Sequence, residues 1–484
     1  MIHLAQIIHK LLPKKKPTIL RPLVLLSLRY QKTKERMVGY MTECITKQLT
    51  FSFIRKHKVT VDFEGGEITS DAGLLLVRQA DNALGLIPGI AGCIVDRRDY
   101  RYTDHDLETL LRQRMYQIVA GYEDCNDANV VRRDPALKTA CGRKLSDEDL
   151  GSQPTLSRLE NANTRNGLYR VGEYFINLYI RRNRRRKPKR IILDLDGTDD
   201  PTYGDQQLTF FHGYYDQYMY HPLLIYDADT GELITAVLRP GNKHASYGAV
   251  MILKRIVPKL KEAFPRAEII IRGDAGFAVP ELYEYCEEEG LKYVIGLIRN
   301  DVLERMIEAL LEKAHEQYTK TGQKQRMFAE GAYKAGSWKK ERRVIMKAEW
   351  LIQGPNSRFV VTNLSHEPKE LYEFYTERGG TCEVRIDEFK NGLKADRLSC
   401  HRFVANQFRL FLHMAAYWLV LRLREALRKT EFASMQIQQL RLRLLKIGGQ
   451  VIQTARRVWF RLASGYPWKN IFALVHHRLT ADTG

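Results

Sequence analysis

The feature that most constrains the fold of this chain is a pair of short apolar runs that each end in acidic residues. Residues 190–196 read Arg-Ile-Ile-Leu-Asp-Leu-Asp, and residues 268–274 read Glu-Ile-Ile-Ile-Arg-Gly-Asp. Runs of this length and composition predict buried strands. Carboxylates at the end of a buried strand fit an open α/β sheet, which places its ligands outside the carboxyl ends of its strands. We therefore expect a mixed α/β core with an acidic site at one edge of its sheet.

The residues around these two runs alternate between the periods of strands and helices. Strands are predicted at 190–196, 268–273 and 293–298, a hairpin at 221–226 and 233–238, and helices at 245–264 and 279–289. The apolar period then shortens toward two, which predicts a β-rich insertion at 318–365. The helical period returns at 369–377, 383–391 and 401–428 and predicts an α-helical C-terminus. The catalytic part would thus comprise residues 191–317, the insertion, and a helical remainder at 366–484.

The N-terminal part of the chain predicts a mostly helical domain over residues 41–180. Alternating apolar and polar residues at 59–77, with Gly65 and Gly66 between them, predict a short hairpin before the helices begin. A helix is predicted at 105–120, with Thr103 and Asp104 as candidate caps. The stretch beginning at Ser152 has the features of a helix start with exposed polar groups, either for reading DNA or as an ordinary surface helix.

The positive charge of the chain is concentrated in three segments. The net charge of +20 comes from 77 Lys and Arg against 57 Asp and Glu. The basic segments are residues 1–40, 181–190 and 402–484, and the rest of the chain is mildly acidic. Clustered Lys and Arg predict binding to the phosphate backbone of a nucleic acid. The alternative is solvated helix faces that only maintain solubility. Residues 1–40 are interpreted as a disordered arm, an over-long translation start or a transit-like peptide.

Composition excludes several classes of protein. An apolar content of 44% is enough for a sizeable core, and the length of 484 residues suggests about three domains. No window reaches the roughly 18 uninterrupted apolar residues of a membrane helix. Seven cysteines without a Cys-x-x-Cys pair fit neither a disulfide framework nor a zinc ribbon. We expect a soluble protein of a reducing, cytosolic compartment.

Carboxylates from three distant places in the sequence are the candidate chemistry. Asp194 and Asp196 lie two residues apart and so point to one face of their strand. Asp274 closes the second acidic strand. Glu383 and Lys390 are seven residues apart, which places them on one face of a helix. Converging carboxylates repel each other unless a cation lies between them, and carboxylate oxygens are ligands that suit Mg²⁺ or Mn²⁺. Two such ions about 4 Å apart would activate a water or a 3′-hydroxyl and would stabilise the leaving oxygen of a phosphodiester. The alternative is that these aspartates are turn formers.

An ordered set of motifs resembles the DDE transposases of bacterial insertion sequences, and within them the insertion sequence thirteen-eighty group. The resemblance runs from about Met41 to the C-terminus. Its carriers are Leu193-Asp194-Leu195-Asp196-Gly197-Thr198-Asp199-Asp200, Phe211-His212-Gly213-Tyr214-Tyr215-Asp216, Arg272-Gly273-Asp274-Ala275-Gly276-Phe277, Tyr375-Thr376-Glu377-Arg378, Glu383 to Lys390, and Ala405-Asn406-Gln407. The resemblance implies a ribonuclease H-like catalytic core, often with a β-rich insertion between the second and third acids, and DNA cleavage and rejoining with two divalent metal ions.

The resemblance also implies roles for individual residues. Asp196, Asp274 and Glu383 would be the catalytic metal ligands. The family's signature maps further onto Tyr375, Arg378 and Lys390, with the two basic residues gripping phosphates of the transposon end.

One spacing departs from the family pattern, because four residues separate Arg378 from Glu383 where the family has three. This departure weakens the role implied for Arg378 more than the role implied for Glu383. Glu388 and Glu377 are the alternative third acids.

The function that the resemblance implies is transposition of the chain's own element. The terminal inverted repeats would bind the N-terminal helices and the basic linker at 181–190, which includes Arg181, Arg182, Arg184, Arg185, Arg186 and Lys187. The partners would be double-stranded transposon ends and target DNA, held by a dimer in the bacterial cytoplasm at the nucleoid. The alternatives are a metal-dependent nuclease that cuts without joining and a domesticated DNA-binding protein that no longer catalyses.

Overall fold

The computed structural model describes residues 48–481 of the chain, so the predicted basic arm at 1–40 lies outside the described residues. The chain divides into two units, Met1–Gly66 and Glu67–Gly484. The described part of the first unit is an antiparallel hairpin of β1 (Leu49–Ile54) and β2 (His57–Val61). Within residues 48–481, no helix has the length and apolar character needed to cross a membrane.

The second unit is built around a nine-stranded sheet, of which five strands that end at the edge strand β9 form a mixed parallel and antiparallel part. These strands are β4 (Arg190–Gly197), β8 (Leu223–Asp227), β9 (Leu233–Val237), β10 (Glu268–Gly273) and β11 (Lys292–Leu297), in the spatial order β11-β10-β4-β8-β9. Strands β8 and β9 run antiparallel to their neighbours, whereas β10 and β11 continue from β4 in parallel. The prediction of a mixed α/β fold is confirmed, whereas the ribonuclease H-like core that the resemblance implied stays a prediction.

Two helices connect the parallel strands. They are α10 (Ala249–Ala263), which joins β9 to β10, and α11 (Pro280–Glu288), which joins β10 to β11. Leu253, Ile256 and Leu260 recur at helical spacing along α10 and are fully buried in the hydrophobic cluster that also holds Ile191 and Ile271 of the sheet. The predicted helices and strands of this region were therefore right in type, with ends displaced by a few residues.

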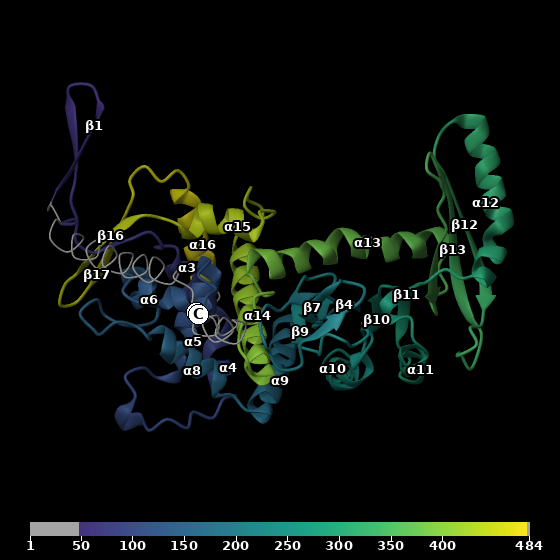
Figure 1. Ribbon diagram of the computed structural model, residues 1–484, viewed down its shortest axis with the longest axis horizontal. Coiled ribbons are helices and arrows are strands. Elements are labelled where there is room, and N and C mark those ends of the chain that lie inside the picture. Colours follow the sequence, from purple (N-terminus) through teal and green to yellow (C-terminus); the bar gives the residue numbers. More distant parts are fainter. Residues whose placement is uncertain (1–47, 482–484) are drawn as a thin grey trace, which may run out of the picture. The chain divides into compact units, whose positions relative to one another are not determined.

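The segment between the second and third predicted acids extends the sheet. It contains α12 (Asp301–Thr321), β12 (Gln325–Tyr333), β13 (Arg342–Leu351), β14 (Gly354–Pro355) and β15 (Arg358–Thr362). Strand β15 pairs with β11, so β12 and β13 join the central sheet through it instead of forming a sheet of their own. Helix α12 packs against β12 and β13 (Figure 1).

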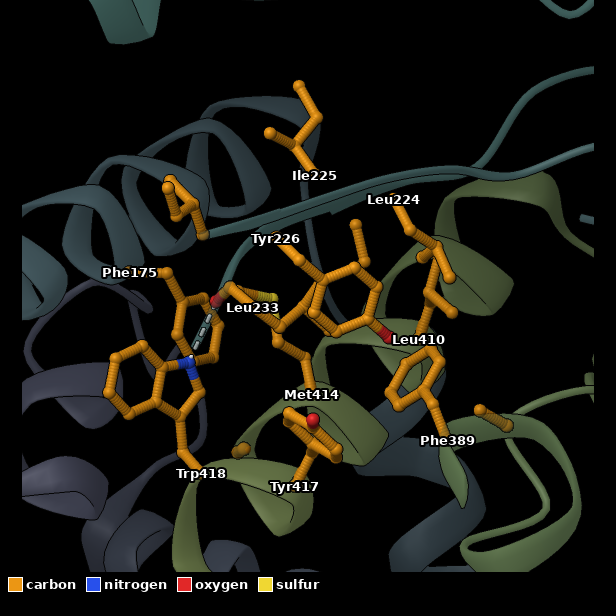
Figure 2. Close-up of a cluster of buried hydrophobic side chains, with 14 of the residues drawn as sticks. Phe175, Leu224, Ile225, Tyr226, Leu233, Phe389, Leu410, Met414, Tyr417 and Trp418 are labelled. Atoms are coloured by element: carbon orange, nitrogen blue, oxygen red, sulfur yellow. Dashed lines mark hydrogen bonds between the residues drawn. The ribbon is translucent and has the colours of Figure 1, made fainter. Parts of the chain in front are cut away.

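Two long helices follow. Helix α13 (Pro368–Asp387) is continuous where two helices were expected, and it passes into a π-helical turn, Glu388–Gly392. Helix α14 (Phe403–Ala426) is almost entirely buried. Its Trp418 and Tyr417 lie beneath β8 and β9, and Trp418 Nε1 donates a hydrogen bond of 3.0 Å to the Leu233 carbonyl oxygen (Figure 2).

The region before the sheet is helical. Its helices are α3 (Leu74–Leu84), α4 (Leu86–Ala91), α5 (Leu107–Ala120), α6 (Ala128–Val131), α7 (Pro135–Ala140), α8 (Gln153–Asn161) and α9 (Arg165–Asn183). The cap of α5 is Asp106, not Thr103 or Asp104, because its carboxylate accepts a hydrogen bond of 2.7 Å from the Thr109 amide.

Two expectations about strands were wrong. The hairpin predicted at 59–77 does not form, because β2 pairs with β1 and β3 (Ile68–Thr69) pairs with β16 (Gly449–Gln453). The apolar residues from Leu74 onward form α3, since a short apolar run does not by itself distinguish strand from helix.

The C-terminus is not wholly helical either. Beside α15 (Ile437–Leu440) and α16 (Lys469–Ala481), β16 and β17 (Val458–Leu462) form a three-stranded sheet with β3. The sequences of the two strands, GQVIQ and VWFRL, do not alternate strictly between apolar and polar residues, so the strand period was not apparent in them.

Candidate active site

The first two predicted acids lie side by side at one end of the central sheet. Strands β4 and β10 are parallel neighbours in which Leu195 pairs with Gly273. Asp196 and Asp274 each follow that pair by one residue, so both stand at the same level at the carboxyl ends of adjacent strands. This is the edge at which open α/β sheets bind ligands.

Helix α13 brings the third acid to the same end of the sheet. Arg378 of α13 donates hydrogen bonds to the Asp196 carboxylate and, at 3.2 Å, to the Leu195 carbonyl oxygen. One turn later the Cys382 Sγ lies 3.9 Å from Asp196 Oδ2. Glu383 follows directly, and its Oε1 lies 3.9 Å from the position that a Cβ atom would occupy at Gly379. The Glu383 carboxylate thus points back along the helix toward the turn that holds Arg378.

The surroundings of Asp196 shift the pKa of its carboxyl group. Burial raises the pKa of the Asp196 carboxyl to about 6, and the adjacent Arg378 guanidinium opposes that rise. The negative charges of Asp274 and Glu383 raise the pKa of Asp196 further. A cation bound among these carboxylates would offset their mutual repulsion.

Asp194 has a different role from its neighbour. Its carboxylate is fully buried and binds Arg272 in a bidentate ion pair, with distances of 2.6 and 2.9 Å to Nε and Nη2. Arg272 also donates a hydrogen bond of 2.7 Å to the Phe374 carbonyl oxygen of α13. This pair fastens β4, β10 and α13 together directly behind the acidic site.

Asp274 also acts locally, as the turn-forming alternative expected. Its Oδ1 accepts a hydrogen bond of 2.9 Å from the Gly276 amide and caps a short 3₁₀ helix, Ala275–Phe277. An aspartate that caps a turn with one oxygen keeps its second oxygen for another partner, so the two roles are compatible.

Lys390 lies beside the segment that follows β4. Its Nζ is 2.6 Å from Asp199 Oδ1, and Gln217 Nε2 donates a hydrogen bond of 3.1 Å to the other oxygen of Asp199. Burial lowers the stability of the charged Asp199 carboxylate, but the Lys390 hydrogen bond and charge outweigh it and lower the pKa of Asp199. Lys390 therefore has a carboxylate partner in this structure.

Tyr375 lies close against strand β11. A Cβ atom at Gly296 would lie 2.4 Å from the Tyr375 hydroxyl oxygen, so the strand can approach α13 this closely only with glycine at that position. Burial raises the pKa of Tyr375, and the charge of Arg378 opposes that rise. The negative charge of Asp274 also raises the pKa of Tyr375.

The sequence motif Phe211 to Asp216 had no assigned role, and the structure places part of it at the site. The Tyr215 and His212 rings lie 5.1 Å apart, and His212 lies 5.2 Å from His221. Burial raises the pKa of Tyr215 to about 12, and the charges of Asp199 and Asp196 raise it further. The clustering of His and Tyr in a short turn was the signal that could have indicated this position.

The basic segment predicted as a linker is partly helical. Residues 181–183 form the last turn of α9. Arg182 is engaged in ion pairs with Glu232, at 2.8 Å, and Glu425. Arg181 donates a hydrogen bond of 3.1 Å to the Leu84 carbonyl oxygen. The side chains that follow the helix are exposed: Arg184, Arg185, Arg186 and Lys187.

The two alternative third acids lie in contrasting surroundings. The Glu388 carboxylate is buried, forms an ion pair with Arg424 and accepts a hydrogen bond of 3.3 Å from the Ile437 amide. Glu377 is largely exposed, and its Oε2 lies 3.9 Å from Arg272 Nη1.

The donor set suits a hard divalent cation, but the side chains are not arranged around one. Asp196, Asp274 and Glu383 offer only carboxylate oxygens, which Mg²⁺ and Mn²⁺ prefer. Within residues 48–481, no three His, Cys, Asp or Glu side chains are grouped closely enough to hold a metal ion. Arg378 supplies the positive charge beside Asp196 instead. The residues fit a metal in chemistry, and binding one would require Arg378 and Glu383 to shift.

The sequence of residues 51–483 matches the family model described as transposase DDE domain group 1. The match covers most of the chain. The protein belongs to this DDE transposase family. Among solved structures, the chain is similar to a piggyBac transposase in a synaptic complex with hairpin DNA, with 13% sequence identity, a TM-score of 0.41 and 83% of each chain covered. No curated protein matches the sequence.

Membership of the DDE transposase family confirms the coarser part of the prediction. The family is one of phosphoryl-transfer enzymes that act in transposition, and its matched region includes all three predicted acids. The narrower assignment to the insertion sequence thirteen-eighty group stays a prediction.

Proposed function

We propose that this transposase binds the terminal inverted repeats of its own element, cleaves the DNA at those ends and joins them to a target. The observation that carries the proposal is the placement of Asp196 and Asp274 at the ends of adjacent parallel strands, with Glu383 on the helix that crosses them. The family match to residues 51–483 supports the reaction class.

In this proposal Asp196, Asp274 and Glu383 would hold Mg²⁺ or Mn²⁺. Two such ions, when bound, would stabilise charge on the attacking and leaving oxygens of a phosphodiester. The chain's own contribution is to fix the carboxylates. The buried Asp194–Arg272 pair and the hydrogen bond from Arg272 to α13 keep strands and helix in register.

Arg378 and Lys390 would bind phosphates only after exchanging partners. In the structure their cationic groups contact Asp196 and Asp199. A phosphate would replace a carboxylate as the partner of each cation, and Asp196 would then be released for a metal ion. The phosphate-gripping role of both residues, like that of the exposed basic residues at 184–187, stays part of the proposal.

The test is a strand-transfer assay with purified full-length protein. Pre-cleaved DNA ends carrying the inverted repeats of the element would be incubated with a target plasmid and Mg²⁺. We expect joined products, because a transposase attacks the target with the 3′-hydroxyl of the end. Cutting of the plasmid, or of an uncleaved end duplex supplied in parallel, without joining would favour the nuclease alternative. Binding without either reaction would favour a domesticated DNA-binding protein.

The DNA partner is tested separately by the salt dependence of binding. Each phosphate neutralised by Lys or Arg adds about 0.9 to the slope of log affinity against log salt for duplex DNA. We expect affinity for the end duplex to fall by at least about a hundredfold between about 50 and 200 mM salt, as it does for proteins with several phosphate contacts. A flat response would contradict phosphate binding by the basic segments. We also propose that two copies hold the two ends together.

A further inference from the structure

Several basic side chains of the C-terminal segment 402–484 are used within the protein. Hydrogen bonds or ion pairs inside the second unit engage Arg402, Arg409, Arg424, Arg441, Lys446 and Arg478. These residues therefore contribute little to the binding of an external polyanion. The basic side chains of the hairpin of β16 and β17 are exposed.

The small sheet that contains this hairpin has one buried and one exposed face. Thr69 and Val451 lie on the inner face and are 2% and 3% exposed. On the outer face Ile68 is 59% and Trp459 is 50% exposed. The register confirms the shared face, because Ile68 pairs with Gln450, which pairs with Arg461, and Ile452 pairs with Trp459. An outer sheet face is normally polar, and this one carries isoleucine and tryptophan.

Two arginines flank the exposed tryptophan along the edge strand. Arg457, Trp459 and Arg461 alternate in sequence and so project from the same side of the hairpin. The Arg457 Cζ lies 5.6 Å from the centre of the indole ring. None of the ion pairs formed among residues 48–481 involves Arg457 or Arg461. The two charges are therefore free of acidic partners in the part of the chain that the structure describes.

Edge strands often carry charged residues to prevent pairing with another chain. That role explains Arg457 and Arg461 but not a half-exposed tryptophan between them. Aromatic rings that alternate with basic groups are instead the pattern of surfaces that bind single-stranded nucleic acid, where bases stack on the ring and phosphates contact the cations.

We propose that the outer face of this sheet, formed by Ile68, Ile452, Arg457, Trp459 and Arg461, binds a stretch of unpaired DNA next to the transposon end. The Trp459 indole stacks on an unpaired base, and the two arginines bind phosphates on either side of it. This inference rests on the proposed function, because it assigns an additional contact to the same DNA substrate.

The experiment compares two labelled DNA probes with the full-length protein. One is a blunt end duplex, and the other is the same duplex with a 3′ single-stranded extension of about ten nucleotides. Trp459→Ala should weaken binding of the extended probe about tenfold, in the range measured for the loss of one stacked base, and leave the blunt duplex unaffected. Arg457→Gln with Arg461→Gln should lower the salt slope on the extended probe by about 1.4, or 0.7 for each lost phosphate contact.

Controls separate this inference from the proposed function. Trp350→Ala removes an indole that stacks on His315, outside the outer face of the small sheet, and should not change the affinity for either DNA probe. Trp459→Phe keeps an aromatic ring and should retain most of the binding to the extended probe. If the parent protein binds neither probe, the proposed function itself fails.

Two results would overturn the inference while leaving the proposed function intact. In the first, the parent binds both probes and Trp459→Ala binds them equally well. In the second, Trp459→Ala changes the mass of the protein in sedimentation without changing its DNA affinity, which would assign the face to contact between two copies of this chain.

Discussion

The carboxyl group of Asp196 lies between one arginine and two further acids, so its charge depends on all of them. Burial raises its pKa to about 6, and Arg378 is the cation that opposes this rise. Asp274 differs in being anchored, because it caps the turn that follows β10. The site thus combines one acid whose charge responds to its surroundings with one whose position is fixed.

Replacing Asp274 by alanine should abolish DNA cleavage. The change removes one of the proposed metal ligands from the end of β10, and we expect nicking of an end duplex in Mg²⁺ to slow by at least about a thousandfold, or ~4 kcal/mol of activation free energy. The rate would be measured beside that of the parent under single-turnover conditions. Equal rates would show that these carboxylates are not the catalytic site. Asp274→Asn, which can still cap the turn, separates loss of charge from loss of local structure.

The identity of the third acid is testable by a matched pair of variants on α13. Glu383→Gln should reduce cleavage to the same extent as Asp274→Ala, because Glu383 is the α13 carboxylate whose charge reaches Asp196. Glu377→Gln should retain more than about half of the parent rate, since removing one surface charge usually has small effects. Cleavage rates of both variants, with circular dichroism to confirm folding, provide the measurement. The opposite pattern would transfer the role to Glu377.

At the scale of elements, a buried ion-pair cluster joins three helices. Glu160 of α8 accepts a hydrogen bond of 2.8 Å from Arg114 Nε of α5 and lies 3.4 Å from Arg409 Nη1 of α14. The thiols of Cys125 and Cys400 also donate to its carboxylate. Burial disfavours the charged carboxylate, but Arg409 and Arg114 outweigh that effect and lower the pKa of Glu160 to about 2.

This cluster predicts how stability depends on pH. Because the pKa of Glu160 in the folded protein is below its ordinary value of 4.5, its stabilising contribution is complete above about pH 4.5 and is lost as the pH falls toward 2. Glu160→Gln should lower the free energy of unfolding at pH 7 by about 3 kcal/mol, and the difference should shrink below pH 4. Urea unfolding at pH 7, 4 and 3 measures it.

A surface pair provides the control for the Glu160 experiment. Glu289 forms an ion pair of 2.6 Å with Lys261, and both side chains are 41% exposed. Glu289→Gln should change the free energy of unfolding by less than about 1 kcal/mol. If Glu160→Gln lowers the free energy of unfolding by the same amount at pH 7 and at pH 3, the lowered pKa of Glu160 is contradicted.

The elements that could be predicted from the sequence were those whose apolar residues follow one clear pattern, either a periodic face or a continuous run. Strands β4 and β10 were found because continuous Ile and Leu runs between polar ends suit strands buried on both faces. The small sheet of β3, β16 and β17 was missed because its strands are short and because β3 pairs with β16, which lies at the other end of the second unit's sequence. Pairing at such distance leaves no local signal in β3.

The candidate site was partly predictable for the same reason. The acids at the ends of β4 and β10 stand out because a carboxylate after an apolar run needs an explanation. The partners of Arg378 and Lys390 could not be found from spacing, because Asp196 and Asp199 lie more than 180 residues away from them. Only the fold of α13 over the sheet decides which cation meets which carboxylate.

At the scale of the whole second unit, helix α14 connects the N-terminal helices with the sheet. It contacts α3, α5, α8 and α9 on one side and β9 on the other. Its buried side chains belong to one continuous hydrophobic cluster that extends from Leu74 to Leu479. Since the helical region and the sheet share this cluster, we expect them to unfold together.

Trp418→Ala tests this cooperativity. The indole is buried between α9 and β9 and donates a hydrogen bond to the Leu233 carbonyl oxygen (Figure 2). Its removal should lower the free energy of unfolding by about 3–5 kcal/mol, as for other large-to-small changes at fully buried sites. Amide hydrogen exchange should then increase together in peptides from α5 and from β9, although the lost hydrogen bond lies on β9. Ile352→Ala, at a position that is 90% exposed, should change neither the free energy of unfolding nor the exchange of these peptides. If α5 keeps its protection while β9 loses it, the helical region is an independently folding domain.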